Sequence, residues 1–413
     1  MPDLAEAARS ARAWACYDCG KCTATCPVAR AGAIYSPRRH VLAANLRQRD
    51  ELAADGSLAS CLTCSLCDRR CPAQVAYTDL VRELRALSYN AGAQPECPHG
   101  GALHALMRMI AKGSTQQDRL GWLSGGQDAH PTRRQDAQPT DPPPSPSLGG
   151  RGAVLGGLKT ERQRGQVFYW TGCTMYYDAF FSDLQPATLR GTQAAVRLMN
   201  ALGITPVVSP NERCCGHDLL WSGDRQSFEL LARHNVQLVA DSGAELLVTS
   251  CAECLRTWKL DYAPFFGGKT PRIVHVSEFL AENLPQLRLK ADGQRRITFQ
   301  DPCRLGRHLG IYAPPRQVLA ALPGVELAEM RRCGPAAICC AGGTWSNCDR
   351  FAKQIQVERL REARATGATL LVTACPKCQI HFRCAMKDPQ LGTEIEIELR
   401  DIAELVAGAL EGN

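Results

Sequence analysis

Two four-cysteine runs near the start of the chain constrain its fold more than any other feature. Both read C-x2-C-x2-C-x3-C-P, and they span residues 16–26 and 61–71. A run of this kind holds 4Fe–4S cubanes, with three thiolates on one cluster and the fourth on the other. Zinc sites usually show paired C-x2-C units instead. Cross-ligation assigns one cubane to Cys16, Cys19, Cys22 and Cys71, and the other to Cys61, Cys64, Cys67 and Cys26.

The residues around these runs predict helices. The segment between the runs contains SPRRHVLAANLRQRDELAADGS, which begins with Ser-Pro and continues as an Ala-, Leu- and Arg-rich stretch. A second helical segment, VAYTDLVRELRALSYN, follows Pro72. We therefore expect residues 1–112 to form an all-α, ferredoxin-like domain that conducts electrons between two cubanes.

Residues 113–165 are expected to be a low-complexity linker. They include GGQDAHPTRRQDAQPTDPPPSPSLGGRGAVLGG, which has almost no large apolar residue, and they predict no fixed structure. Gly150, Gly152 and Gly156 loosely imitate a dinucleotide fingerprint, but the third glycine is one place late and no strand precedes them.

The rest of the chain is an internal duplication. The first unit contains VFYWTGC, ERCCGHD and GAELLVTSCAEC, and the second contains ITFQDPC, AAICCAGG and GATLLVTACPKC. In each unit a helix, expected at 224–242 or 344–366, ends at a glycine and leads into an apolar strand. This order predicts α/β units with a mostly parallel sheet, over residues 166–292 and 293–413.

Each unit places five cysteines after its strands and at a vicinal pair. Because the carboxyl ends of parallel strands share one edge, five thiolates can converge there. Adjacent cysteines make a poor disulfide, since the bridge requires a strained geometry between neighbours. Two explanations of the five cysteines remain, which are ligation of a metal centre and a set of thiols without metal. The two sets are Cys173, Cys214, Cys215, Cys251 and Cys254, and Cys303, Cys339, Cys340, Cys375 and Cys378.

This arrangement resembles the family of heterodisulfide reductase D subunits, in which a two-cubane helical module precedes two cysteine-rich CCG repeats. The resemblance covers nearly all of the chain except the linker. It implies Rossmann-like CCG domains, with one or two non-cubane 4Fe–4S clusters ligated by the two five-cysteine sets. It also implies that a disulfide is cleaved between the repeats.

Two features bear on this resemblance. The second repeat has Ala341 where the first has Gly216, and glycine there would allow a positive φ or a close backbone approach. The iron–sulfur subunits of glycolate and lactate oxidases share the architecture without reducing heterodisulfides. The alternative function is therefore a non-catalytic electron carrier for a flavin-dependent oxidase. A third interpretation, a thiol-based redox sensor, predicts no iron in the second half.

Composition narrows the cellular setting. The 22 cysteines and the acidic residues near an N-terminus that lacks an apolar export segment favour metal ligation in the cytoplasm. Peripheral docking at the inner membrane face through a partner stays open, because docking through another subunit leaves no hydrophobic span. The net charge of +7 is spread along the chain, which argues against nucleic-acid binding. Expected partners are a flavoprotein or a membrane cytochrome, and a small thiol or disulfide substrate. No hydrolytic constellation is evident.

Several further residues have a structural and a functional interpretation. His217 is either a core histidine or a donor beside a cluster, and Arg304 and Arg307 are either a solvated basic face or groups that hold an anion or tune a cluster. The cysteines outside the patterns are expected to be inert buried thiols. They are Cys97, Cys333, Cys348 and Cys384.

Overall fold

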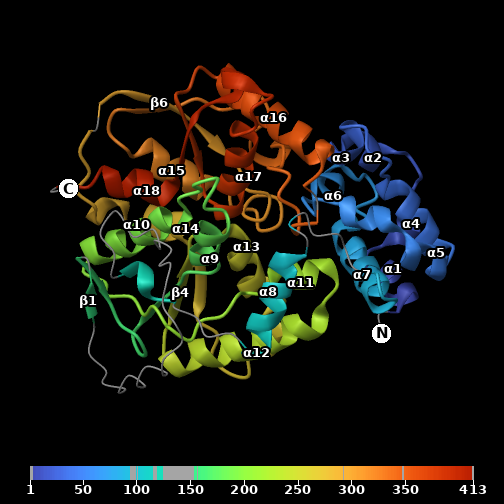
Figure 1. The fold of residues 1–413 in the computed structure, drawn as a ribbon, viewed down its shortest axis with the longest axis horizontal. Coiled ribbons are helices and arrows are strands. Elements are labelled where there is room, and N and C mark those ends of the chain that lie inside the picture. The colour runs from blue at the N-terminus through green and yellow to red at the C-terminus, as the bar shows by residue number, and fades with distance from the viewer. Residues whose placement is uncertain are drawn as a thin grey trace, which may run out of the picture.

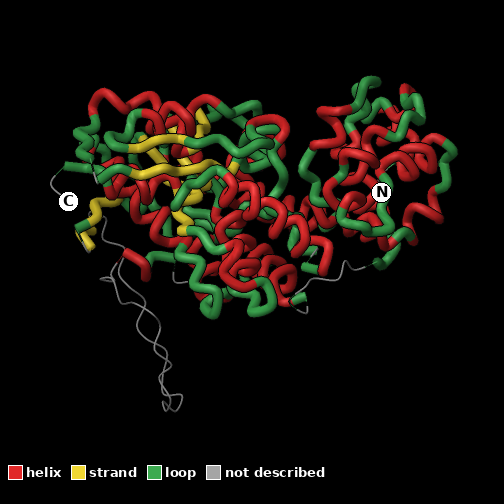
Figure 2. The backbone as a smooth tube through the Cα atoms, turned by 90° about the horizontal axis from the view of Figure 1, so that it is seen from above, coloured by secondary structure: helices red, strands yellow, loops and turns green. Residues whose placement is uncertain are grey.

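The computed structural model describes residues 3–93, 99, 101–114, 119–123, 153–155, 157–291, 293–346 and 348–411. An N-terminal helical region is followed by two α/β repeats (Figure 1). Figure 2 shows that the described strands lie in the part of the molecule that contains the repeats, while the N-terminal region beside it consists of helices and loops. Within these residues no helix combines the length and apolarity that crossing a membrane requires.

The helices of the N-terminal region lie before, within, between and after the two cysteine runs. They are α1 (Leu4–Ser10), α2 (Lys21–Thr25), α3 (Pro27–Arg30), α4 (Pro37–Asn45), α5 (Arg49–Ala54), α6 (Leu66–Arg70) and α7 (Tyr77–Asn90). Ser36 accepts a hydrogen bond from the Arg39 backbone N–H and caps α4, with Pro37 in its first turn. The segment between the runs is thus helical, as expected, but it is two helices. A turn at Arg47, with φ of 58°, divides them.

The first repeat has a parallel three-stranded sheet in the order β3-β4-β5. Its strands are β3 (Val167–Trp170), β4 (Leu246–Thr249) and β5 (Arg272–His275). An isolated parallel bridge from Val207 to Phe168 lies beyond β3. Its principal helices are α9 (Thr174–Phe180), α10 (Thr188–Ala201), α11 (His217–Ser222), α12 (Arg225–Ser242), α13 (Ala252–Arg256) and α14 (Val276–Asn283).

The second repeat has a parallel four-stranded sheet in the order β7-β6-β8-β9. The strands are β6 (Arg295–Gln300), β7 (Val325–Leu327), β8 (Leu370–Thr373) and β9 (Glu398–Asp401). The helices are α15 (Ala313–Ala320), α16 (Arg350–Ala365), α17 (Pro376–Met386) and α18 (Ile402–Gly408). The helix expected at 344–366 begins only at Arg350, capped by Asp349, because residues before it form a loop in which Trp345 has a φ of 60°.

The repeats pack through two equivalent pairs of helices. Helix α10 of the first repeat lies against α18 of the second, and α14 of the first lies against α15 of the second (Figure 1). Strands β4 and β8, which carry the two LLVT sequences, are buried except for partly exposed Leu246. Their continuous apolar runs are those expected of strands covered on both faces.

Two segments depart from the expected boundaries. Helix α8 (Ala102–Ala111), assigned from sequence to the N-terminal domain, packs against α11 and α12 of the first repeat. Within 113–165, the expected lack of fixed structure does not hold for 119–123, where Trp122 and Leu123 are buried. It also does not hold for a hairpin of β1 (Ala153–Leu155) and β2 (Leu158–Thr160). Gly150, Gly152 and Gly156 lie outside the described residues.

Candidate iron–sulfur sites

The first five-cysteine set gathers at the carboxyl ends of two strands. Cys173 follows β3, the vicinal pair precedes α11, and the C-x2-C pair follows β4. The Sγ atoms of Cys173 and Cys214 lie 3.3 Å apart, and those of Cys215 and Cys254 lie 3.4 Å apart. Cys251 interacts with Cys254, and all five thiols are buried. The structure thus brings together all five residues predicted from the first repeat.

The second set has the same arrangement. The Sγ atoms of Cys303 and Cys339 lie 3.9 Å apart, and Cys340 and Cys375 each interact with Cys378. Four of these thiols are buried and Cys303 is partly exposed. The two sets meet, because Cys251 shares a side-chain hydrogen bond with Cys375, the corresponding cysteine of the other repeat.

Each N-terminal set lines its own small cavity. The first cavity is lined by Cys16, Cys19, Cys22 and Cys71, with Cys67 at its edge, among other residues. The second is lined by Cys26, Cys61, Cys64 and Cys67. This grouping is the one that cross-ligation predicts, with the fourth cysteine of each run beside the other run.

The chemistry of these thiols fits an iron–sulfur cluster. Burial raises the pKa of Cys26 to about 12, so this thiol would be protonated and unreactive without a cation. A bound iron removes the proton outright and offsets the unfavourable burial. Sulfur donors on short loops after strands and in tight helical turns are the ligand type that such clusters require.

The second predicted cubane site, which consists of Cys61, Cys64, Cys67 and Cys26, lies against the second repeat. Arg304 donates from Nη1 to the Thr63 carbonyl at 2.7 Å and from Nη2 to Thr63 Oγ1 at 2.6 Å. Arg307 donates to the Cys64 carbonyl and to the Ala337 carbonyl, both at 2.5 Å. Both arginines are buried, so they do not form a solvated basic face. They join the loop of Cys64 to the loop of Cys303.

The charge of Arg307 faces thiols from both domains. Burial opposes that charge, but Cys64, Cys303 and Cys339 raise the pKa of Arg307 above its usual value. Cys64 and Cys303 also interact electrostatically with each other. The predicted second cubane and the predicted second-repeat cluster are therefore neighbours across this interface.

Aromatic and cationic side chains complete the interface. The Trp221 ring of α11 contacts three guanidinium groups, at 4.2 Å for Arg304, 4.7 Å for Arg256 and 5.3 Å for Arg82. Each comes from a different part of the chain, so the indole connects the N-terminal region and both repeats. Cation–π contacts of buried groups are worth about 1–2 kcal/mol each.

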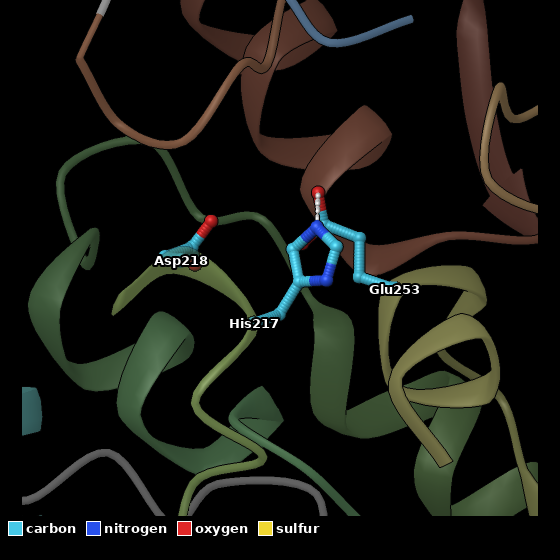
Figure 3. Close-up of side chains that lie close together, drawn as sticks. All are labelled: His217, Asp218 and Glu253. Atoms are coloured by element: carbon cyan, nitrogen blue, oxygen red, sulfur yellow. Dashed lines mark ion pairs between the residues drawn. The ribbon is translucent and has the colours of Figure 1, made fainter. Parts of the chain in front are cut away.

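A buried group of charged side chains lies between the repeats (Figure 3). Ligand atoms of His217, Asp218 and Glu253 lie within 4.8 Å of one another, as in a metal site. The Lys377 ammonium occupies this position, at 2.5 Å from Asp218 Oδ1 and 2.8 Å from Glu253 Oε2. The two carboxyl groups raise the pKa of Lys377 despite its burial. This fixed cation disfavours a further metal ion there.

His217 belongs to this buried group and not to a cysteine set. Its Nδ1 lies 3.0 Å from Thr257 Oγ1, and its Nε2 lies 3.8 Å from Glu253. Burial, reinforced by Arg304, lowers the pKa of His217 well below its usual value. Burial also raises the pKa of Glu253 to about 8. The imidazole is therefore neutral at neutral pH, and the Glu253 carboxyl can gain or lose a proton near this pH.

Arg119 is a site residue that the sequence did not reveal. It is buried, and its Nη2 donates to Glu212 Oε1 at 2.6 Å and to the Gly172 carbonyl at 2.7 Å. Its charge also acts on Cys173 and Cys214. Arg119 lies within a low-complexity segment, so no motif marked it. Glu212, the first residue of ERCCGHD, could have signalled a buried partner.

The two CCG-type turns have the same backbone conformation. Gly216 has a φ of 72° and Ala341 a φ of 59°. The alanine therefore adopts the left-handed conformation that glycine adopts more readily. The geometry of the second turn is retained, at the expense of local strain.

The cysteines outside the patterns are not uniformly buried. Cys333 and Cys384 are partly exposed and Cys348 is exposed, while Cys97 lies outside the described residues. Cys348 and Cys384 also interact with each other. The expectation of inert buried thiols is wrong for this pair.

Comparisons with known proteins agree with this layout. A model of a cysteine-rich domain, CCG, matches residues 167–259 and 297–383, and a model of a 4Fe-4S dicluster domain matches residues 12–75. The D subunit of dihydromethanophenazine:CoB–CoM heterodisulfide reductase from Methanosarcina mazei is 29% identical over 85% of this chain and 77% of its own length. That of Methanosarcina barkeri is 27% identical over 96% and 93%. The B subunit of fumarate reductase (CoM/CoB) from Methanothermobacter marburgensis is 26% identical over 95% and 71%.

Proposed function

Because this chain belongs to the iron–sulfur proteins that join a 4Fe–4S dicluster domain to two CCG domains, we propose that it delivers electrons to a disulfide within a heterodisulfide reductase-like complex. Electrons would enter at the cubane site of Cys16, Cys19, Cys22 and Cys71. They would then pass to the cubane site of Cys61, Cys64, Cys67 and Cys26. They continue to the second CCG set and then to the first. The disulfide is reduced where the two CCG sets meet.

The contiguity of the thiol sets is the observation that carries this proposal. Cys64 lies close enough to Cys303 and Cys339 to interact electrostatically with both. Cys375 in turn interacts with Cys251. The cubane sets also adjoin, because Cys67 lines both N-terminal cavities. No long insulating stretch of protein separates one set from the next along this route through the described residues.

The chain's own residues support each transfer. Arg304 and Arg307 fix the loop of Cys64 against the second repeat through buried charge-assisted hydrogen bonds. Lys377 links α17 to Asp218 and Glu253 across the repeats. These contacts hold the donor and acceptor sets in one geometry and exclude water from between them.

The reaction requires two electrons and two protons. One disulfide, RSSR′, takes up two electrons and two protons to give RSH and R′SH, and the CCG cysteine sets would hold the iron–sulfur clusters that supply single electrons. The Glu253 carboxyl, with its pKa of about 8, can take up a proton beside Cys251. It is placed to return that proton to a thiolate released at the junction of the two sets.

The relatives named above are subunits of reductases, so we propose that this chain also works in a complex. A flavoprotein or a membrane cytochrome would supply electrons to the exposed side of the first cubane set, where Cys19 is exposed. Docking on the membrane cytochrome would place this chain at the inner face of the membrane.

Iron and acid-labile sulfide per chain, measured on anaerobically purified protein, test this proposal. Two cubanes and two four-iron CCG clusters require about 16 irons, and loss of the second CCG cluster leaves about 12. Addition of a thiol or disulfide should then change the electron paramagnetic resonance of the CCG signals and leave the cubane signals unchanged. A content of about 8 irons would overturn the CCG assignment.

A full iron content without any change on adding thiol or disulfide would instead support the carrier function, especially if a flavin oxidase co-purifies. The fumarate reductase subunit among the relatives favours keeping this second candidate.

A further inference from the structure

Two cysteines outside the predicted cluster sets form a thiol pair on the second repeat. Cys384 lies near the end of α17, and Cys348 lies just before α16. The two side chains share a hydrogen bond. Cys348 is exposed and Cys384 is partly exposed, so reagents in solution can reach the pair.

Lys353 makes one member of the pair nucleophilic. Its Nζ lies 3.3 Å from Cys384 Sγ and donates to the Cys384 carbonyl at 3.0 Å. The hydrogen bond from Cys348 and the charge of Lys353 lower the pKa of Cys384 to about 6, against the opposing effects of burial and of Asp388. The hydrogen bond with Cys384 and burial raise the pKa of Cys348. At neutral pH the pair is thus a thiolate beside a thiol, the pattern of reactive dithiols.

The pair is specific to the second repeat. The residues at the corresponding positions of the first repeat are Gly223 and Leu260. Cys348 ends the loop that follows the vicinal pair, and Cys384 lies on the helix that begins at the second C-x2-C. A bond between them would fasten that loop to α17.

We propose that Cys348 and Cys384 form a metal-free redox site that undergoes thiol–disulfide exchange with a low-molecular-weight disulfide. The Cys384 thiolate attacks the disulfide RSSR, forms a mixed disulfide and releases one RS⁻. Cys348 then loses its proton and attacks Cys384 Sγ, which releases the second RS⁻. The proton lost by Cys348 and one proton from the solvent convert the two RS⁻ to RSH, so the products are a Cys348–Cys384 disulfide and two RSH, and excess thiol reverses the reaction. This site does not depend on the function proposed for the clusters.

Holoprotein equilibrated anaerobically in buffers of oxidised and reduced glutathione tests the site. After alkylation of free thiols, mass spectrometry should detect a peptide pair joined through Cys348 and Cys384, two hydrogens lighter than the reduced pair. Its fraction should follow the glutathione ratio and return to zero with excess thiol. Cys333 serves as the internal control and should remain free to alkylate.

Two variants separate this site from incidental oxidation. Cys348→Ser should abolish the linked peptide and leave a glutathione adduct on Cys384, with iron content unchanged. Lys353→Met should slow alkylation of Cys384 at pH 7 about tenfold, because less thiolate is present. The proposal is overturned if an excess of oxidised glutathione leaves both cysteines separately alkylated. It is equally overturned if each cysteine forms only a single glutathione adduct. It is also overturned if Cys384 of the Lys353→Met variant is alkylated at the wild-type rate.

Discussion

The two CCG repeats share a scaffold but differ in the charges that surround their cysteines. Glu253 lies within the first C-x2-C, and Lys377 lies at the corresponding position of the second. The first set receives the positive charge of Arg119 from a segment outside the repeat, whereas the second receives that of Arg307 from its own loop. Tyr177 occupies the position in the first repeat that corresponds to Arg307.

This difference shows how a duplicated unit acquires two roles. The cysteine positions and the parallel strand pairing are retained in both repeats, so each gathers five thiols at one edge of its sheet. The surrounding residues have diverged, and the loop of Cys303 in the second repeat contacts the loop of Cys64 through Arg307. Under the proposed function, the order of electron transfer would be encoded in the side chains around the ligands.

The largest expected effect comes from removing the cation between the repeats. Lys377→Met leaves Asp218 buried without its partner, which should lower the free energy of unfolding by about 3–5 kcal/mol. Chemical denaturation of the holoprotein measures this change. Lys269→Met, which removes an exposed pair with Glu245, is the control and should change the free energy of unfolding far less, because solvent screens exposed pairs. Equal effects of the two variants would mean that the inter-repeat pair has no special importance.

The caps that follow β5 and β9 should give the repeats opposite responses to pH. Asp401 caps α18, and burial raises its pKa to about 8. Between about pH 4 and 8 the unfolded chain loses this proton while the folded chain retains it, so stability falls as pH rises. Asp401→Asn preserves the cap and should remove about 2 kcal/mol of this decline between about pH 5 and 8, measured by denaturation at each pH.

The corresponding cap of the first repeat is His275, whose pKa burial lowers to about 4. Here the unfolded chain gains a proton as pH falls below about 6.5, and the folded chain does not, so stability falls on acidification. His275→Asn should therefore reduce the loss of stability below about pH 6.5 and leave the stability at higher pH unchanged. A variant that flattened the opposite side would contradict the cap assignment.

Removing the positive charge beside one CCG set should lower the reduction potential of a cluster bound by that set. Arg307→Met removes a buried cation beside Cys303 and Cys339, so the second-set potential should fall by about 60 mV, a tenfold change for one electron. Arg119→Met should lower the first-set potential instead. Redox titration followed by electron paramagnetic resonance distinguishes the two. If both variants shift the same signal, the sets are not independent.

The smallest effect concerns the turn after each vicinal pair. Gly216→Ala adds a Cβ 3.0 Å from Phe228 Cδ2 at a positive φ, and should cost about 1–2 kcal/mol. Ala341→Gly relieves strain and should stabilise the second repeat by up to about 1 kcal/mol. Thermal unfolding of both variants checks the pair. A loss of stability for Ala341→Gly would show that the methyl group packs favourably enough to outweigh the strain.

The sequence allowed the repeats and the grouping of their cysteines to be predicted because both depend on local order. A glycine-ended helix, an apolar LLVT strand and a following C-x2-C must lie next to one another in space, as they do in the chain. Spacing alone also grouped Cys26 with the second run and Cys71 with the first. The structure places these residues together.

The remaining features depend on contacts between distant segments. Arg119 meets Glu212 although nothing near either residue in sequence indicates the other. Arg304 and Arg307 are compatible in sequence with a basic surface, but the N-terminal region covers them. The expected start of α16 was wrong because residues 344–349 lack Gly and Pro, yet Trp345 has a positive φ and its ring packs against His381 and Phe181.

The pairing of Glu253 with Lys377 has an evolutionary consequence. A symmetric dimer of single repeats would set each of these positions against its own copy, so two carboxyl groups or two ammonium groups would face each other in the interior. The present residues are compatible only with an asymmetric pairing. Once these residues had diverged, each repeat matched the other better than it matched a second copy of itself.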